Sequence, residues 1–158
     1  LGDALAVCLM KLRDFKSEDF AAFHPGGSLG KRLYLKVKDT MRKSNLPIAK
    51  DDISLKSAIT AMSEGRLGSV LLVDNDGNLS GILSDGDLRR ALENDSFNIN
   101  SKAIEFATKN PKTLDNPDML AYDAFRLIEE YKIQILIIQK DQKPIGLLHI
   151  HDLTSLGL

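Results

Sequence analysis

The sequence predicts an α/β protein built from two copies of one unit, with a short helical segment before them. Residues 36–93 and 101–158 follow the same order: a helix, a short strand, a helix, two strands joined by a turn, and a closing helix. The central strands are continuous apolar runs, which is typical of sheets covered on both faces. One such unit covers its own sheet poorly. We therefore expect helices on one face of each sheet and the other copy on the opposite face.

In the first copy, Ser54 is placed to cap a helix, and Gly65 lies where that helix should end. The segment 67–73 predicts a strand, 74–78 has turn composition, and 79–84 predicts the return strand. A helix over 85–93 closes the unit. The apolar face of the capped helix consists of Leu55, Ala58, Ile59 and Met62.

The second copy repeats this plan. Its strands are predicted over 133–138 and 145–149, joined by a turn within 139–144. The apolar face of its first long helix consists of Leu120, Ala124, Leu127, Ile128 and Tyr131. The two copies agree best at their ends, where 81–88 (GILSDGDL) aligns with 146–153 (GLLHIHDL).

The CBS module ends in a recognisable pattern: Gly, two apolar residues, Ser or Thr, two residues of any type, Asp and an apolar residue. A repeat of the present kind with this ending resembles that module. Residues 81–88 match every position of that pattern. The resemblance implies a tandem CBS pair that binds ligands, most often adenine nucleotides, in clefts between the copies. It assigns Ser84 to phosphate or ribose contact and Asp87 to the ribose hydroxyls.

The chemistry of these residues agrees with that assignment. Ser84 and Asp87 bracket the start of the closing helix, where backbone N–H groups and the helix dipole favour an anion. The alternative is structural: Ser84 or Asp85 caps the helix, and Asp87 stabilises its first turn. Four cations could help to bind a phosphate: Arg66, Arg89, Arg90 and Lys112. Surface Arg and Lys are common, so the sequence singles out none of them.

The second copy departs from the pattern, because His149 stands where Ser or Thr is expected, while Asp152 is retained. These two residues are the equivalent candidate ligand contacts. His149 and His151 would share one side of a strand if the strand continued that far, which raises the alternative of a metal site. Two histidines and one carboxylate are a weak metal signal, so we expect no metal.

The leading segment, residues 1–35, is unrelated to the repeat. Leu5, Cys8, Leu9 and Leu12 have helical spacing, which predicts an apolar stripe that packs against another element and a buried Cys8 thiol. Because the first residues already read as the middle of a helix, we expect the chain to be part of a longer one.

Residues 24–33 (HPGGSLGKRL) follow a short helix expected to begin near Ser17, and the glycines Gly26, Gly27 and Gly30 predict a mobile, exposed backbone. This string, after LGDALA at 1–6, resembles the end of the sugar isomerase (SIS) domain of bacterial D-arabinose 5-phosphate isomerases, which leads into a CBS pair in that family.

This second resemblance implies a parent enzyme that interconverts ribulose 5-phosphate and arabinose 5-phosphate for octulosonate and lipopolysaccharide synthesis. His24 matches the family's active-site histidine, and imidazole suits proton transfer near neutral pH. The other catalytic groups of the family are not found here, so we expect the chain alone to be inactive. The expected domains are 1–35 (SIS remnant and linker), 36–94 (CBS 1) and 95–158 (CBS 2).

Composition narrows the class of partner. Lys and Arg number 21 against 22 Asp and Glu, so there is no basic excess to attract nucleic acid or acidic membranes. A membrane-spanning helix needs about 20 apolar residues, and no apolar run in the sequence approaches that length. The single Cys8 cannot form an internal disulfide, which suits the cytoplasm.

Three functional readings remain open. The first is a regulatory CBS pair that binds a nucleotide or nucleotide-sugar and needs no cofactor. The second is a ligand-free module that forms a flat, disc-like homodimer through its helices and orders a tetrameric parent, with residues 1–35 loose or held by a neighbour. The third is the CBS pair of a different nucleotide-regulated protein.

Overall fold

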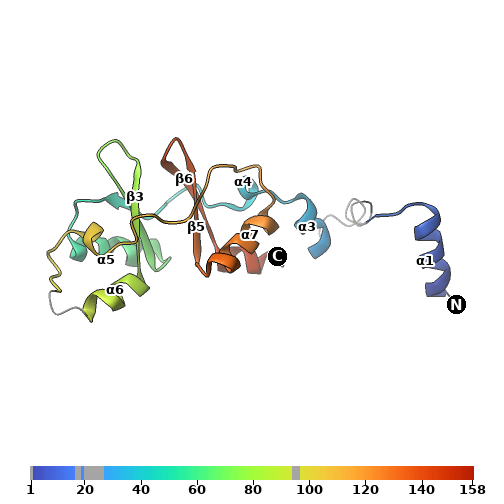
Figure 1. The fold of residues 1–158 in the computed structure, drawn as a ribbon, viewed down its shortest axis with the longest axis horizontal. Coiled ribbons are helices and arrows are strands. Elements are labelled where there is room, and N and C mark those ends of the chain that lie inside the picture. Colours follow the sequence, from blue (N-terminus) through green and yellow to red (C-terminus); the bar gives the residue numbers. More distant parts are fainter. Residues whose placement is uncertain (1, 17–18, 20–26, 94–96) are drawn as a thin grey trace. The chain divides into compact units, whose positions relative to one another are not determined.

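A computed structural model describes residues 2–16, 19, 27–93 and 97–158 (Figure 1). The helices are α1 (Gly2–Leu12), α3 (Ser28–Tyr34), α4 (Val37–Thr40), α5 (Leu55–Gly65), α6 (Asp85–Leu92), α7 (Ala121–Tyr131), α8 (Ile150–Ser155) and the 3-10 helix η1 (Ala103–Glu105). The strands are β1 (Ile48–Lys50), β2 (Ser69–Val73), β3 (Leu79–Ser84), β4 (Thr113–Leu114), β5 (Ile135–Lys140) and β6 (Lys143–His149). The predicted order of elements in each copy is confirmed.

The chain forms two compact units that cut across the two sequence copies. One unit contains residues 41–116 and 135–149, and therefore holds every strand named above. The other contains residues 1–40, 117–134 and 150–158, and consists of helices. Elements from both copies thus meet within each unit.

The strands form two sheets of the same design, in the orders β1-β2-β3 and β4-β5-β6. In each sheet the first pair of strands is parallel and the second is an antiparallel hairpin. The hairpins have matching registers, since Ser69 pairs with Ser84 in one and Ile135 pairs with His149 in the other. The internal sequence repeat is therefore also a structural repeat (Figure 1).

Both faces of β2 are covered, as its continuous apolar sequence predicts. All its residues are buried. Val70 and Leu72 belong to a core cluster with residues of α5, including Leu55. Leu71, which points to the opposite face, belongs to a second cluster with Ile137 of the other sheet. Helices thus cover one face of this sheet and the second copy covers the other.

The leading helix of the second copy closes the core of the first. Ala103 of η1 is fully buried in the cluster that contains Leu55. Its N–H donates to the carbonyl of Ile53 at 2.9 Å, and the N–H of Leu55 donates to the carbonyl of Ser101 at 2.8 Å. These bonds tie the start of α5 to a segment almost fifty residues further along the chain.

The reciprocal exchange occurs in the helical unit. The N–H of Val37, at the start of α4, donates to the carbonyl of Met119 at 2.9 Å, and the N–H of Ala121 donates to the carbonyl of Leu35 at 2.7 Å. Beside them, hydrogen bonds from Lys38 and Lys36 hold the pKa of the exposed Asp118 carboxyl below its ordinary value. The leading helix of each copy therefore packs against elements of the other copy.

A glycine in each hairpin permits a segment of the other copy to pair with it. An ideal Cβ on Gly81 would lie 2.9 Å from the carbonyl oxygen of Thr108, and one on Gly146 would lie 2.9 Å from the carbonyl oxygen of Arg42. The next residue in each hairpin makes a two-bond bridge to the same partner: Ile82 with Thr108, and Leu147 with Arg42. A side chain at either glycine would push the paired backbone away.

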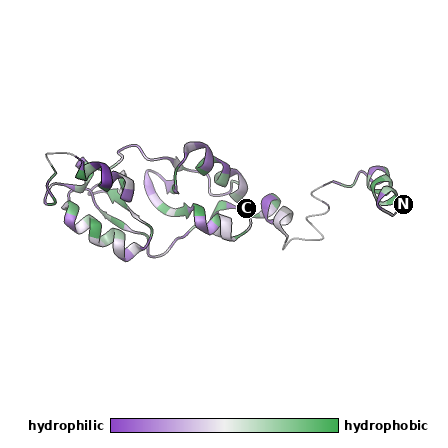
Figure 2. Cartoon of the chain, turned by 90° about the horizontal axis from the view of Figure 1, so that it is seen from below, coloured by the Kyte–Doolittle hydropathy of each residue, from purple (hydrophilic) through white to green (hydrophobic). Residues whose placement is uncertain are grey.

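The leading segment departs from expectation at α1. All described residues of this helix are exposed, including Cys8, so the predicted burial of the thiol is wrong. Leu5 is 58% exposed and Leu12 is 82% exposed. Figure 2 shows hydrophobic and hydrophilic residues along α1. The stripe exists as predicted, but no described residue of the chain covers it.

The prediction of a mobile, exposed backbone is also wrong at Gly30. This glycine is buried within α3, and neighbouring side chains attach the helix to the helical unit. Lys31 Nζ donates to the carbonyl of Leu156 at 2.9 Å, and the Arg32 guanidinium lies 4.9 Å from the ring centre of Tyr122. Residues 28–34 are therefore not loose. Ser17 and Gly26 lie outside the described residues.

Replacing Gly81 with alanine tests the close approach. We expect Gly81→Ala to lower the free energy of unfolding by about 1 to 3 kcal/mol, as overpacking against a fixed backbone does. Gly86→Ala is the control, because its Cβ would make only ordinary contacts at 3.6 Å. Urea denaturation measures both variants. Equal stability of Gly81→Ala and the wild type would contradict the role of this glycine.

Candidate functional site

The first candidate site lies where β3 ends at Ser84 and α6 begins at Asp85. Ser84 Oγ accepts a hydrogen bond from the N–H of Asp87 at 3.3 Å. In return, Asp87 Oδ2 accepts from the N–H of Ser84 at 2.9 Å and from its hydroxyl at 2.5 Å. This reciprocal arrangement is a capping box, with Asp87 in the place of the usual Glu.

The second oxygen of Asp87 faces two further donors. Oδ1 accepts from a guanidinium nitrogen of Arg90, one turn along α6, and from the hydroxyl of Thr108 at 3.3 Å. Thr108 belongs to the segment that pairs with Ile82. Asp87 itself is buried, with 5% of its surface exposed. Donors from both copies therefore fix this carboxylate.

Thr108 is the member of the site that sequence reasoning missed. Its only signal is its position before β4, which gives no indication of contact with a residue 21 positions earlier. The structure shows that Ser84 and Asp87 cap α6. It does not test whether capping is their only role. Their contact with a ligand stays a prediction.

The second copy places its candidates differently. His149 is the last residue of β6 and is buried, with 8% exposed. His151 and Asp152 lie in the first turn of α8, because the helix begins at Ile150. The strand geometry that would set both histidines on one side therefore does not exist. Within the described ranges, no group of three or more His, Cys, Asp or Glu residues could hold a metal ion.

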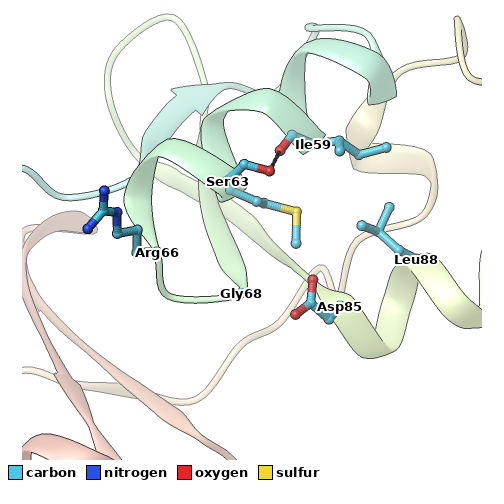
Figure 3. Close-up of a pocket in the computed structure, with 7 residues that line it drawn as sticks. Ile59, Ser63, Arg66, Gly68, Asp85 and Leu88 are labelled. Carbon is cyan, nitrogen blue, oxygen red and sulfur yellow. Dashed lines mark hydrogen bonds between the residues drawn. The ribbon is translucent and has the colours of Figure 1, made fainter.

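A pocket of about 250 Å³ opens between the end of α5 and the start of α6 (Figure 3). Asp85 reaches into it beside Gly68, whose φ of +60° and lack of a side chain make room: a Cβ there would lie 2.7 Å from Asp85 Oδ2. Arg66 lines the rim and points away from the other residues drawn. The remaining lining residues are Ile59, Met62, Ser63 and Leu88. Ser84 and Asp87 do not line this pocket.

The remaining candidates are scattered. Arg89 is exposed on α6, and Lys112 lies just before β4. His24 lies outside the described residues. No helix in the part of the chain that the structure describes is long and apolar enough to cross a membrane.

The repeated sheets, the swapped leading helices and the capped α6 define a tandem pair of CBS domains. The CBS domain family profile matches residues 37–94 and 103–157, so the chain belongs to that family. The predicted fold class is confirmed.

Among curated proteins, the chain resembles bacterial arabinose 5-phosphate isomerases. It is 41% identical over its full length to arabinose 5-phosphate isomerase KdsD of Francisella tularensis, covering 48% of that protein. An uncharacterized protein of Helicobacter pylori is 48% identical over the full chain, which again covers 48% of the relative. The expected resemblance is confirmed, and the chain spans about half the length of these relatives.

Solved structures support the fold. The crystal structure of CBSX2 in complex with AMP has a TM-score of 0.69 at 24% identity, covering 78% of this chain and 96% of that one. The CBS domain pair of protein MJ0100, in complex with 5-methylthioadenosine and S-adenosyl-L-methionine, has a TM-score of 0.69 at 22% identity and the same coverage.

Ser84→Ala tests the capping box. We expect the free energy of unfolding to fall by about 1 kcal/mol, because the N–H of Asp87 loses its acceptor. Ser63→Ala is a matched control, since that hydroxyl only donates to the carbonyl of Ile59 within α5. Chemical denaturation followed by circular dichroism measures both. Equal losses in the two variants would argue against a specific role for the cap.

Proposed function

We propose that this CBS pair is a regulatory unit that binds a nucleotide or nucleotide-sugar at Ser84 and Asp87. One observation carries the proposal: a buried carboxylate, oriented by donors from both copies, stands at the start of α6. A buried, oriented carboxylate suits a ribose hydroxyl. No cofactor is required for this role.

The ligands of structural neighbours support the chemical class. CBSX2 holds AMP, and the MJ0100 pair holds 5-methylthioadenosine and S-adenosyl-L-methionine. All three ligands contain adenine on a ribose that keeps its 2′,3′-diol. The equivalent site in this chain's second copy, at His149 and Asp152, lacks the hydroxyl of Ser84. We expect it to bind the same ligands more weakly.

The parent activity is part of the same proposal. The unit would adjust a cytoplasmic isomerase that interconverts ribulose 5-phosphate and arabinose 5-phosphate for octulosonate and lipopolysaccharide synthesis, with His24 at the active site and the CBS pairs within a tetramer. The relatives named arabinose 5-phosphate isomerase support this context.

Calorimetric titration of the chain with AMP, ATP, CMP, a CMP-linked octulosonate and arabinose 5-phosphate tests the sensor. We expect saturable binding of one nucleotide class, weakened about tenfold or more by Asp87→Asn, which corresponds to about 1.4 kcal/mol. Asp76→Asn, in the exposed β2–β3 turn, is the matched control. Circular dichroism verifies that each variant is folded. Undiminished binding by Asp87→Asn would place the ligand elsewhere.

A purely structural role is the second candidate, favoured by apolar surface on α5 and α6. Leu92 is 66% exposed, and Ile59 and Leu88 are partly exposed at the pocket. A homodimer through these helices would cover them. A stable dimer by light scattering, combined with no heat from any ligand in the titration, would favour assembly over sensing.

The chain alone should not catalyse isomerisation. We expect the purified chain to convert no arabinose 5-phosphate to ribulose 5-phosphate when the reaction is followed by NMR. An enediol mechanism needs both an acid and a base at the substrate, and of the family's catalytic groups we expect only His24 in this chain. Turnover above the buffer control would contradict this expectation and would direct attention to His24.

A further inference from the structure

The Asp87 carboxylate has no acceptor position left over for a ligand. Its side chain is 6% exposed. Its donors are the N–H and hydroxyl of Ser84 on Oδ2, and Arg90 and Thr108 on Oδ1. An ionised carboxylate offers about four lone-pair positions, so these donors fill it. A ribose hydroxyl that binds Asp87 must therefore replace one of them.

The four donors differ in how easily they can be replaced. The bond from the N–H of Ser84 to Oδ2 belongs to the capping box, and losing it would weaken the cap of α6. The Ser84 hydroxyl is held beside Oδ2 because its oxygen accepts from the N–H of Asp87. Thr108 is fixed by its two backbone bonds to Ile82. The Arg90 side chain is 69% exposed, and water competes effectively for such an exposed ion-pair partner. Arg90 is thus the donor that is easiest to displace.

A displaced Arg90 would stay close to the start of α6. An ideal Cβ on Gly86 lies 3.6 Å from Nη1 of Arg90 and 3.6 Å from Oγ of Ser84, so the guanidinium lies beside the first turn of the helix. A guanidinium binds phosphate through paired N–H groups. The movement of Arg90 that frees an acceptor position on Asp87 would thus leave the guanidinium available to the ligand's phosphate.

Resting on the proposed function, we propose that Arg90 is a specificity-determining residue that selects phosphorylated ribose ligands over uncharged nucleosides. A nucleotide gives Arg90 a phosphate partner in exchange for Asp87. An uncharged nucleoside takes Asp87 from Arg90 and offers no replacement anion. Arg90 therefore opposes nucleoside binding and supports nucleotide binding at one site.

Titrations with AMP and adenosine test this role in the wild type, Arg90→Gln and Arg126→Gln. Arg126 is an exposed arginine on α7 and controls for the change in charge. We expect the wild type to prefer AMP. In Arg90→Gln, adenosine should bind more tightly and AMP more weakly, so that the ratio of their dissociation constants narrows about tenfold, or about 1.4 kcal/mol. Arg126→Gln should keep the wild-type ratio.

The other outcomes separate the two proposals. If the wild type binds AMP but Arg90→Gln has the same ratio as Arg126→Gln, the role of Arg90 is rejected and the sensor stands. Equal weakening of both ligands by Arg90→Gln also rejects it, because that result indicates general damage to the site. If the wild type binds cytidine nucleotides instead, the same comparison is made with CMP and cytidine. If it binds no nucleotide of the calorimetric titration, the proposed nucleotide site fails, and the role of Arg90 fails with it.

Discussion

The close backbone approach at Gly81 and Gly146 is the constraint on which the rest of the sheet-containing unit depends. At each glycine a segment of the other copy comes so near that a Cβ would lie 2.9 Å from its carbonyl oxygen. The two-bond bridges beside the glycines then hold that segment against the hairpin. The close approach at Gly81 also places Thr108 within hydrogen-bond distance of Asp87. The packing of the two copies and the geometry of the candidate site therefore both depend on this glycine.

The candidate site uses the same hydrogen bonds for folding and for its proposed chemistry. A buried carboxylate is costly unless its oxygens are satisfied, and here the capping box, Arg90 and Thr108 satisfy them. The site is therefore preorganised, but it is also occupied by protein donors. Under the proposed function, a ligand would exchange one of these interactions, so its affinity would depend on the weakest donor as much as on Asp87.

The sequence predicted what is local and missed what is distant. The Ser54 cap, the buried β2 and the Ser84–Asp87 pair follow from spacing within one copy. The exchange of leading helices and the contact of Thr108 join segments tens of residues apart, and periodicity carries no information about such pairs. The burial of Cys8 failed for a different reason: an apolar stripe reveals the need for a partner, and no described element of this chain provides one.

The two copies separate the requirements of the scaffold from those of the site. Both retain the glycine, its bridge and the register that sets Ser84 and His149 at the ends of equivalent strands. The group at that strand end changes from a hydroxyl that can both donate and accept within a capping box to a larger imidazole, and the next two residues change from Asp85 and Gly86 to Ile150 and His151. Because the backbone arrangement is conserved between the copies, a difference in binding between them would arise from these side chains and not from the fold.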